Sequence, residues 1–349
     1  MSYKYKVELI PQSDFFFGGE YTFAKDDTRT KESSRYSAAS TYFPQQSALL
    51  GMIRKTLLIQ NGNLTMHIKG EWVDSKGGRN GNDKNYHEAA RVAGGKPFSY
   101  EKENDFGIIE EISPLFLTHN RTAYTVNAKD ANYEPKQLNA LMSLNGKRQN
   151  ALIFDGYDPK SCIQESFLGE DNSVLKLDDI FQKVQSVGIK KTQNRKDQND
   201  SFFQKTSYKL KGKSSFTFFL TLSEKLSWSD AFVTLGADQS AFILKLTETK
   251  ESFETTFSHI FAKKSLDRVV LHSETLLSEE AYDNALFIFG KRESYRQLKS
   301  TQGRKSKRYY LLQRGSVIYT KDLDATVAAL GQKHLQKAGI NHFTPIKGL

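Results

Sequence analysis

Polar and apolar residues alternate along the start of the chain, where residues 3–10 read YKYKVELI. A period of two is typical of a strand with one face in the core and the other in solvent. Pro11 ends this stretch, because proline cannot donate to a sheet ladder. Further strands are predicted at residues 106–118, 123–128, 214–222, 231–248, 267–277 and, as a pair bent at Gly315, 308–321.

An apolar helix is predicted within residues 42–58, YFPQQSALLGMIRKTLL. Pro44 marks its start, because a proline near the first turn loses no needed N–H group, and Ser47 or a preceding glutamine can cap that turn. Gly51 lies in the middle of this helix, where glycine costs roughly 1 kcal/mol relative to alanine. Other helices are predicted at residues 134–144, 177–188 (closed by Gly188), 279–290 (running into a strand) and 324–340 (ended by Gly339).

Strands and helices intermingled in this way favour an α+β fold with helices on one face of the sheets. The 349 residues leave room for two domains of ordinary size. The pattern breaks near residues 165–176, so we expect one domain over 1–170 and a second over 171–349. Polar stretches at residues 24–41 and 74–97 are expected to be long loops.

Positive charge is concentrated in two stretches. Residues 190–213 hold eight Lys or Arg against two Asp, residues 291–308 hold eight against one Glu, and the rest sums to −3 within a net charge of +10. The first stretch supplies the arms of a long β-hairpin predicted over 189–210, and the second is interpreted as a docking loop for protein or RNA. Clustered cations interleaved with aromatic residues favour a nucleic-acid partner. Solvated loops, or surfaces that meet acidic proteins, are the alternatives.

The sequence offers no strong catalytic constellation. It has a single cysteine, Cys162, no glycine-rich phosphate or dinucleotide motif, and seven histidines without metal-binding spacing. His119, beside Arg121, is the one histidine considered as a general acid–base for RNA cleavage. We therefore expect no enzyme activity, no cofactor and no metal. The chain shows neither an apolar signal core at its start nor a bilayer-spanning run, so a cytoplasmic protein without membrane contact is expected.

Six segments follow one another in the order of one family's motifs. They are SDFFFGGEYTF (13–23), YFPQQSALLGMIRKTLL (42–58), SVGIKKTQNRKDQNDSFFQKTSYKL (186–210), LGADQSAFILKL (235–246), RGSVIYT (314–320) and AGINHFTPIK (338–347). Together they resemble the repeat-associated (RAMP) superfamily of CRISPR proteins, and within it the Cmr-type subunit of type III-B effector complexes. Two positions depart from the pattern, because Ala237 replaces a usual glycine and Ile340 a usual aromatic residue.

The resemblance implies two ferredoxin-like domains, the second carrying the basic β-hairpin, and no catalytic role. It implies a subunit that seats the 5′ handle of the guide RNA and bridges the large palm-domain subunit to the backbone RAMP subunits. In those backbone subunits a protruding hairpin, or thumb, wedges between guide nucleotides, and the resemblance implies the same role for the hairpin of 189–210. The alternatives are a RAMP endoribonuclease that matures guide precursors, the equivalent cap of a type III-A complex, and a purely protein-binding scaffold.

Four residues of the predicted helix share one stripe: Ser47, Gly51, Arg54 and Lys55, at i, i+4, i+7 and i+8. A small residue lets a sugar-phosphate chain approach the helix axis. Arg54 would then bind a phosphate through two hydrogen bonds of its guanidinium. Ser47 would donate a hydrogen bond to the sugar-phosphate chain from its hydroxyl, and Lys55 would act as a point charge. The alternative is that Gly51 admits a packed strand and that the cations are simply solvated.

In the basic hairpin, cations are expected to hold phosphates and aromatic rings to stack on bases, a contact worth roughly 1–3 kcal/mol per base. The expected RNA contacts are Lys190, Lys191, Arg195, Lys196, Phe202 and Phe203. For at least one phenylalanine a core position is the alternative, because adjacent strand residues face opposite ways. Gly315 and Ser316 are expected either to offer backbone N–H groups to a phosphate or to form a structural hairpin turn.

Overall fold

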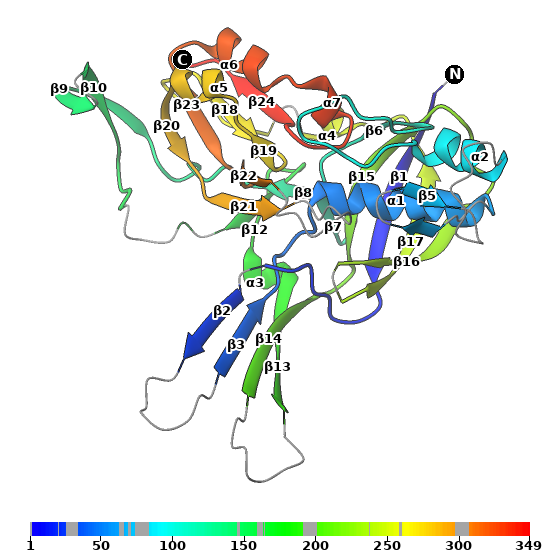
Figure 1. Ribbon diagram of the computed structural model, residues 1–349. Helices are drawn as coiled ribbons and strands as arrows, with labels where there is room; N and C mark the ends of the chain where they lie inside the picture. The colour runs from blue at the N-terminus through cyan, green and yellow to red at the C-terminus, as the bar shows by residue number, and fades with distance from the viewer. Residues whose placement is uncertain are drawn as a thin grey trace.

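The structure is a computed structural model of mixed α/β type, in which sheets dominate the described residues (Figure 1). The described residues are 2–19, 21–25, 34–62, 66–68, 71–73, 84–144, 147–158, 163, 165–190, 201–236, 238–257, 260–296 and 307–349. None of the described helices is long and apolar enough to cross a membrane.

Among the described residues, the largest sheet holds nine strands. Eight follow the order β12-β11-β8-β7-β15-β1-β17-β16, and the ninth, β6, also pairs with β15. They are β1 (Tyr3–Pro11), β6 (Ile109–Ile112), β7 (Phe116–His119), β8 (Thr122–Val126), β11 (Ser166–Gly169), β12 (Val174–Lys176), β15 (Ser214–Leu222), β16 (Asp230–Leu235) and β17 (Ser240–Glu248). β1 is antiparallel to both of its neighbours, β15 and β17. The expected boundary at residue 170 falls between β11 and β12 of this one sheet, and the two ferredoxin-like domains stay a prediction.

The long helix α1 (Gln46–Gln60) crosses the large sheet, and α2 (Lys84–Ala93) packs beside it. The start of α1 two residues after Pro44 confirms the predicted helix. Its buried side chains, among them Leu49, Leu50 and Ile53, join the main core with inward residues of β1 and β15. α2 lies where a loop was predicted over 74–97, so that prediction is wrong for residues 84–93.

A second sheet of four strands projects away from the body (Figure 1). Its order is β13 (Phe181–Lys190), β14 (Ser201–Leu210), β3 (Ser34–Ala39) and β2 (Tyr21–Lys25), with β14 and β3 parallel and the other pairs antiparallel. β13 and β14 confirm the predicted basic hairpin. The helix predicted over 177–188 is wrong beyond its first turn, α3 (Leu177–Ile180), because the chain continues as β13. β2 and β3 occupy both ends of the loop predicted over 24–41.

The C-terminal part contains two smaller sheets. Their strands are β20 (Ala285–Phe289), β23 (Val317–Thr320), β18 (Arg268–Leu271) and β24 (Phe343–Ile346) in one, and β19 (Thr275–Leu276), β22 (Arg308–Leu312) and β21 (Arg292–Arg296) in the other. The helices of this part are α4 (Phe253–Phe257), α5 (Glu279–Asn284), α6 (Leu323–Leu330) and α7 (Lys333–Gln336). The helix predicted over 324–340 is therefore divided in two, with Gly331 between the pieces.

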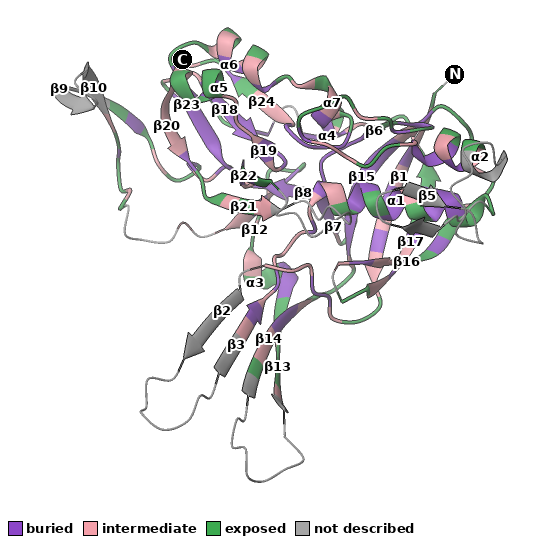
Figure 2. Ribbon diagram, viewed as in Figure 1, coloured by how far each residue is buried: buried purple, intermediate pink, exposed green. Residues whose placement is uncertain are grey.

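Two hairpins stand apart from these sheets, β4–β5 (Met66–Ile68, Glu71–Val73) and β9–β10 (Pro135–Leu144, Lys147–Phe154). β9 is a strand, so the helix predicted over 134–144 is wrong. Figure 2 shows buried residues concentrated in the large sheet, under α1 and in the C-terminal sheets.

A buried ion pair fastens the C-terminal sheet to the segment before β9. Arg268 on β18 pairs with Asp130, which also accepts a hydrogen bond from the Tyr319 hydroxyl at 2.6 Å. The side chains of Arg268 and Asp130 are 2% and 0% exposed. Because an uncompensated charge at such a site is costly, the pair holds these two elements together.

Candidate nucleic-acid interface

The projecting sheet presents an aromatic ring on its surface. Phe203 on β14 is 44% exposed and lies directly opposite Gly188 on β13. A Cβ added at Gly188 would come within 1.9 Å of the Phe203 ring, so the ring rests on the glycine backbone. Gly188 was expected to close a helix, and its structural role is instead to leave room for this ring. Phe203 therefore has an open ring face, as the prediction that it stacks on RNA bases requires.

Three other side chains of β14 show how the projecting sheet is anchored and charged. Lys205 pairs with Asp238, and its ammonium lies 4.9 Å from the centre of the Phe16 ring. The Ser207 hydroxyl donates to Asp14 at 2.6 Å. These contacts tie the root of the sheet to the body, whereas Lys209 is exposed.

The opposite face of the sheet carries Val187, which is 56% exposed, and Lys183, which is also exposed. Side chains alternate between the two faces along each strand, so both faces of the hairpin offer contact surface. The predicted contacts Lys191, Arg195 and Lys196 lie outside the described residues, as do the side chains of Lys190 and Phe202.

Aromatic rings join the root of the projecting sheet to the start of α1. Tyr42 lies 4.7 Å from Tyr208 and 5.3 Å from Phe181, measured between ring centres. Burial, and then the hydrogen bond with Tyr208, raise the pKa of Tyr42 well above its ordinary value. The neutral phenol therefore persists at physiological pH, and these ring contacts connect the projecting sheet to the segment before α1.

The predicted stripe on α1 is only partly open. Gly51 and Lys55 are exposed, and among the described residues nothing lies within 4 Å of a Cβ added at Gly51. The Ser47 hydroxyl is 3.3 Å from the Tyr295 hydroxyl, which links α1 to β21. No close packing in the described part of the chain therefore explains the glycine, so the alternative of a packed strand finds no support there.

Arg54 points away from this open face. Its guanidinium donates to the backbone oxygens of Asp105 at 2.5 Å and Lys96 at 3.4 Å, and it lies 5.6 Å from the centre of the Phe106 ring. Burial lowers the pKa of Arg54 to about 10, although the charge of Asp105 opposes this. The guanidinium that was expected to bind a phosphate thus holds the loop after α2.

Gly315 and Ser316 form a buried junction. The Gly315 N–H donates to the Leu271 oxygen at 2.7 Å, and the Ser316 N–H donates to the Gln313 oxygen at 3.2 Å. Gly315 has φ +75°, and a Cβ there would lie 2.7 Å from Val126 Cγ1. With both N–H groups used inside the chain, the geometry favours the structural turn over a phosphate contact.

Sequence reasoning missed the neighbouring residue, Arg314. Its guanidinium lies 4.4 Å from the centre of the Phe43 ring and donates to Leu115 O at 3.2 Å and to Glu274 at 2.9 Å. It is 8% exposed, so a buried cation sits behind the start of α1. The signal available in the sequence was an arginine placed in the short turn between the apolar stretches 309–312 and 317–319.

The second basic stretch borders a pocket of about 590 Å³ between β21, β22 and α5. Arg292 lies over the Tyr310 ring at 4.6 Å, and Lys307 pairs with Glu101. Glu279 and Asp283 line the same pocket, so its charge is mixed. Residues 297–306 lie outside the described part of the chain, and the docking-loop interpretation stays a prediction.

His119 is held by two neighbours. Its Nδ1 lies 2.7 Å from the Ser214 hydroxyl, and its Nε2 accepts from the Asn120 amide at 3.0 Å. Both ring nitrogens are engaged within the chain, so the geometry does not favour His119 as an acid or base acting on RNA.

Comparison with known proteins gives one family model and a set of similar structures. The model described as "CRISPR-associated protein (Cas_Cmr3)" matches residues 7–302. A cryo-EM structure of the type III-B Cmr-beta bound to cognate target RNA and AMPPnP (state 1) matches with 11% identity and a TM-score of 0.50, covering 98% of this chain and 99% of that chain. A second, of the type III-B Cmr-beta bound to cognate target RNA, matches with 11% identity and a TM-score of 0.52, covering 97% and 96%. No curated protein matches. At this identity the two structures indicate a common fold over the whole chain.

Proposed function

Because the chain belongs to the Cas_Cmr3 family of CRISPR-associated proteins, we propose that it is an RNA-binding subunit that seats the 5′ handle of the guide RNA in a type III-B Cmr complex. Family membership confirms the resemblance to Cmr-type subunits found in the sequence. In this proposal the subunit positions the RNA strand and carries out no chemistry on it. It also bridges the large palm-domain subunit to the backbone RAMP subunits.

The observation that carries the proposal is the half-exposed Phe203 on a sheet that stands clear of the body (Figure 1). An aromatic ring with one open face offers a flat apolar surface to a partner. Stacking on a nucleobase supplies that partner without regard to base identity. Lys209 lies on the same face about 20 Å further along β14, and Lys183 lies on the other face, so the two lysines supply charge for phosphates beyond the stacked base.

The open face of α1 supports a second contact. Its exposed residues are Ala48, Gly51, Lys55 and Ile59. This face holds one cation and two small residues, so a neighbouring chain or a sugar-phosphate backbone can come close to the helix axis. In the proposal this contact holds the strand, or the subunit that carries it, against the root of the projecting sheet.

The test is binding of a fluorescent single-stranded RNA of handle sequence to the purified full chain. Phe203→Ala should weaken binding by about 5- to 150-fold, which corresponds to the loss of one stacked base. Phe203→Tyr keeps the ring and should bind like the native protein. Phe232→Ala is the matched control, because Phe232 on β16 is 70% exposed on a different sheet. Equal RNA affinity of the Phe203→Ala variant and the native protein would contradict the stacking role.

Salt dependence gives an independent readout of the phosphate contacts. For a single strand, the logarithm of the binding constant should fall with the logarithm of salt concentration by roughly 0.7 per neutralised phosphate. Lys209→Gln and Lys183→Gln should each reduce that slope by about this amount if the lysine faces a phosphate. A slope near zero for the native chain would exclude the basic-surface picture and favour the protein-binding scaffold.

A further inference from the structure

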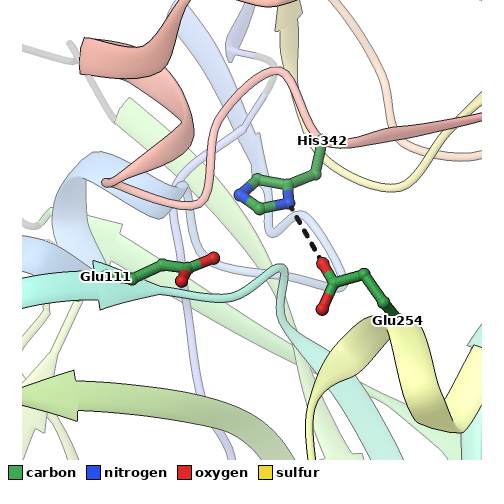
Figure 3. Close-up of side chains that lie close together, drawn as sticks. All are labelled: Glu111, Glu254 and His342. Carbon is green, nitrogen blue, oxygen red and sulfur yellow. Dashed lines mark ion pairs between the residues drawn. The ribbon is translucent and has the colours of Figure 1, made fainter. Parts of the chain in front are cut away.

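Three potential metal ligands from distant parts of the chain meet on one surface, away from the projecting sheet. They are Glu111 on β6, Glu254 on α4 and His342 just before β24 (Figure 3). One ligand atom from each residue lies within 4.8 Å of the others. His342 Nδ1 is 3.9 Å from Glu254 Oε1. The cluster joins the edge of the large sheet to the C-terminal sheet.

The orientation of His342 is the second observation that points to a ligand. Its Nε2 lies 2.8 Å from the backbone oxygen of Gln336. A carbonyl oxygen only accepts, so Nε2 carries a hydrogen, and a metal ion that displaces any proton from Nδ1 can take the Nδ1 lone pair. Figure 3 shows Nδ1 turned toward the Glu254 carboxylate, with the Glu111 carboxylate near the same ring. Histidines that ligate metals usually donate their other N–H to a carbonyl or carboxylate in this way, which fixes both the tautomer and the ring.

Burial and backbone contacts hold the ring while the carboxylates remain adjustable. The His342 side chain is 11% exposed, and that of Glu254 is 62% exposed. The His342 backbone N–H donates to the Ser273 hydroxyl at 3.0 Å, and its oxygen accepts from the His272 N–H at 2.8 Å. Around an ion with metal–ligand distances of about 2.0–2.2 Å, ligand atoms must approach more closely than they do here. Rotation of the two exposed glutamates supplies that movement.

We propose that Glu111, Glu254 and His342 form a binding site for a divalent transition metal, of which Zn²⁺ is the best match. An imidazole nitrogen with carboxylate oxygens suits Zn²⁺, whereas Mg²⁺ and Ca²⁺ prefer oxygen ligands alone. Three protein ligands leave a fourth tetrahedral position for water. The ion would cross-link β6, α4 and the start of β24. Because these ligands lie far apart in sequence, the link closes long loops and stabilises the folded chain.

The test uses the full chain, stripped with EDTA and dialysed, without RNA. ZnCl₂ should raise the melting temperature of the native chain by a few degrees, and MgCl₂ at the same concentration should not. Calorimetric titration should give a Zn²⁺ dissociation constant at least about tenfold weaker in Glu111→Gln and in Glu254→Gln. Both changes are at exposed side chains, so these variants keep the fold. Glu110→Gln, an exposed neighbour on the same strand, is the matched control and should bind like the native chain.

Co²⁺ provides a spectroscopic check of the ligand set. Bound to the native chain, it should give the intense visible d–d absorption of a four-coordinate site, and His342→Gln should abolish this signal. The proposal is overturned if Zn²⁺ leaves the melting temperature of the native chain unchanged. It is equally overturned if Glu111→Gln and Glu254→Gln bind Zn²⁺ as tightly as the Glu110→Gln control.

Discussion

Substitution of Gly51 should raise the stability of the chain and lower its affinity for the guide RNA or for a neighbouring subunit. Glycine in a helix interior is less favourable than alanine by about 0.8–1.0 kcal/mol. A Cβ at this position meets nothing within 4 Å among the described residues, so Gly51→Ala gains this propensity without a steric cost. We therefore expect about 1 kcal/mol more stability in urea denaturation, which corresponds to roughly 1–2 °C in melting temperature for a chain of this length.

Gly51→Gln extends the perturbation outward from the same backbone position. Glutamine is also a better helix former than glycine, so the fold should not suffer. Its side chain should prevent close approach to the helix and remove at least one charge-assisted contact. Such a contact is worth about 1.5–3 kcal/mol, or about 10- to 150-fold in Kd. Gly51→Ala should give a smaller loss in the same direction.

The assay is the affinity of the full chain for handle RNA, together with the yield of assembled complex when the subunits are co-expressed. Gln60→Ala, at an exposed position near the end of the same helix, is the control and should change neither quantity. If Gly51→Gln binds RNA and assembles like the native protein, the glycine is not retained for a close approach. If Gly51→Ala destabilises the fold, the helix has no room for a Cβ at this position.

Three further predictions test the remaining assignments. Arg54→Ala should lower the free energy of unfolding by about 1.5–3 kcal/mol, because its hydrogen bonds are internal, and leave the Kd for the fluorescent handle RNA unchanged. Asp130→Asn should cost about 3–5 kcal/mol in urea denaturation, because the buried Arg268 loses its counter-charge, and a double variant with Arg268→Met should recover much of the loss. Burial, together with repulsion from His342, lowers the pKa of His272 from 6.5 to about 3. The unfolded chain then binds a proton that the folded chain does not, so stability in EDTA should fall as pH drops from about 6.5 towards 3, by up to about 1.4 kcal/mol per unit, and His272→Asn should flatten this slope.

Local sequence patterns predicted the helices and strands that depend least on contacts with distant parts of the chain. β1 was visible because its alternating residues lie on a sheet with one buried face, and α1 because Pro44 and a long apolar run define it. The basic hairpin was visible from charge and from its polar tip. In each case the information lies within some 10–20 residues of the element itself.

The wrong helices show where local patterns mislead. The apolar residues Leu177, Ile180, Phe181, Val184 and Val187 have the spacing of an amphipathic helix, yet only the first turn is helical. The rest pairs with β14, whose position a local window cannot reveal. Residues 134–144 are rich in helix formers, but pairing with β10 overrides that propensity.

The sequence predicted the residue types of the candidate site better than it predicted their arrangement. The sequence marked Arg54 as a surface cation because it shares a stripe with Gly51. The carbonyl oxygens that hold it come from residues 96 and 105, beyond the reach of a helical-wheel argument. Glu111, Glu254 and His342 could not be grouped at all, since their proximity arises only when distant strands and helices pack.

The position of β1 in the large sheet has a consequence for biosynthesis. β1 ends at Pro11, whereas its two partners lie within residues 214–248. At translation rates of roughly 5–20 residues per second, the nascent strand waits about 10–40 s before either partner leaves the ribosome. Pairings of such long sequence separation also form slowly. Throughout that interval Val7 and Leu9 have no sheet to enter, so the emerging chain is a natural client for ribosome-associated chaperones, and truncated products should aggregate.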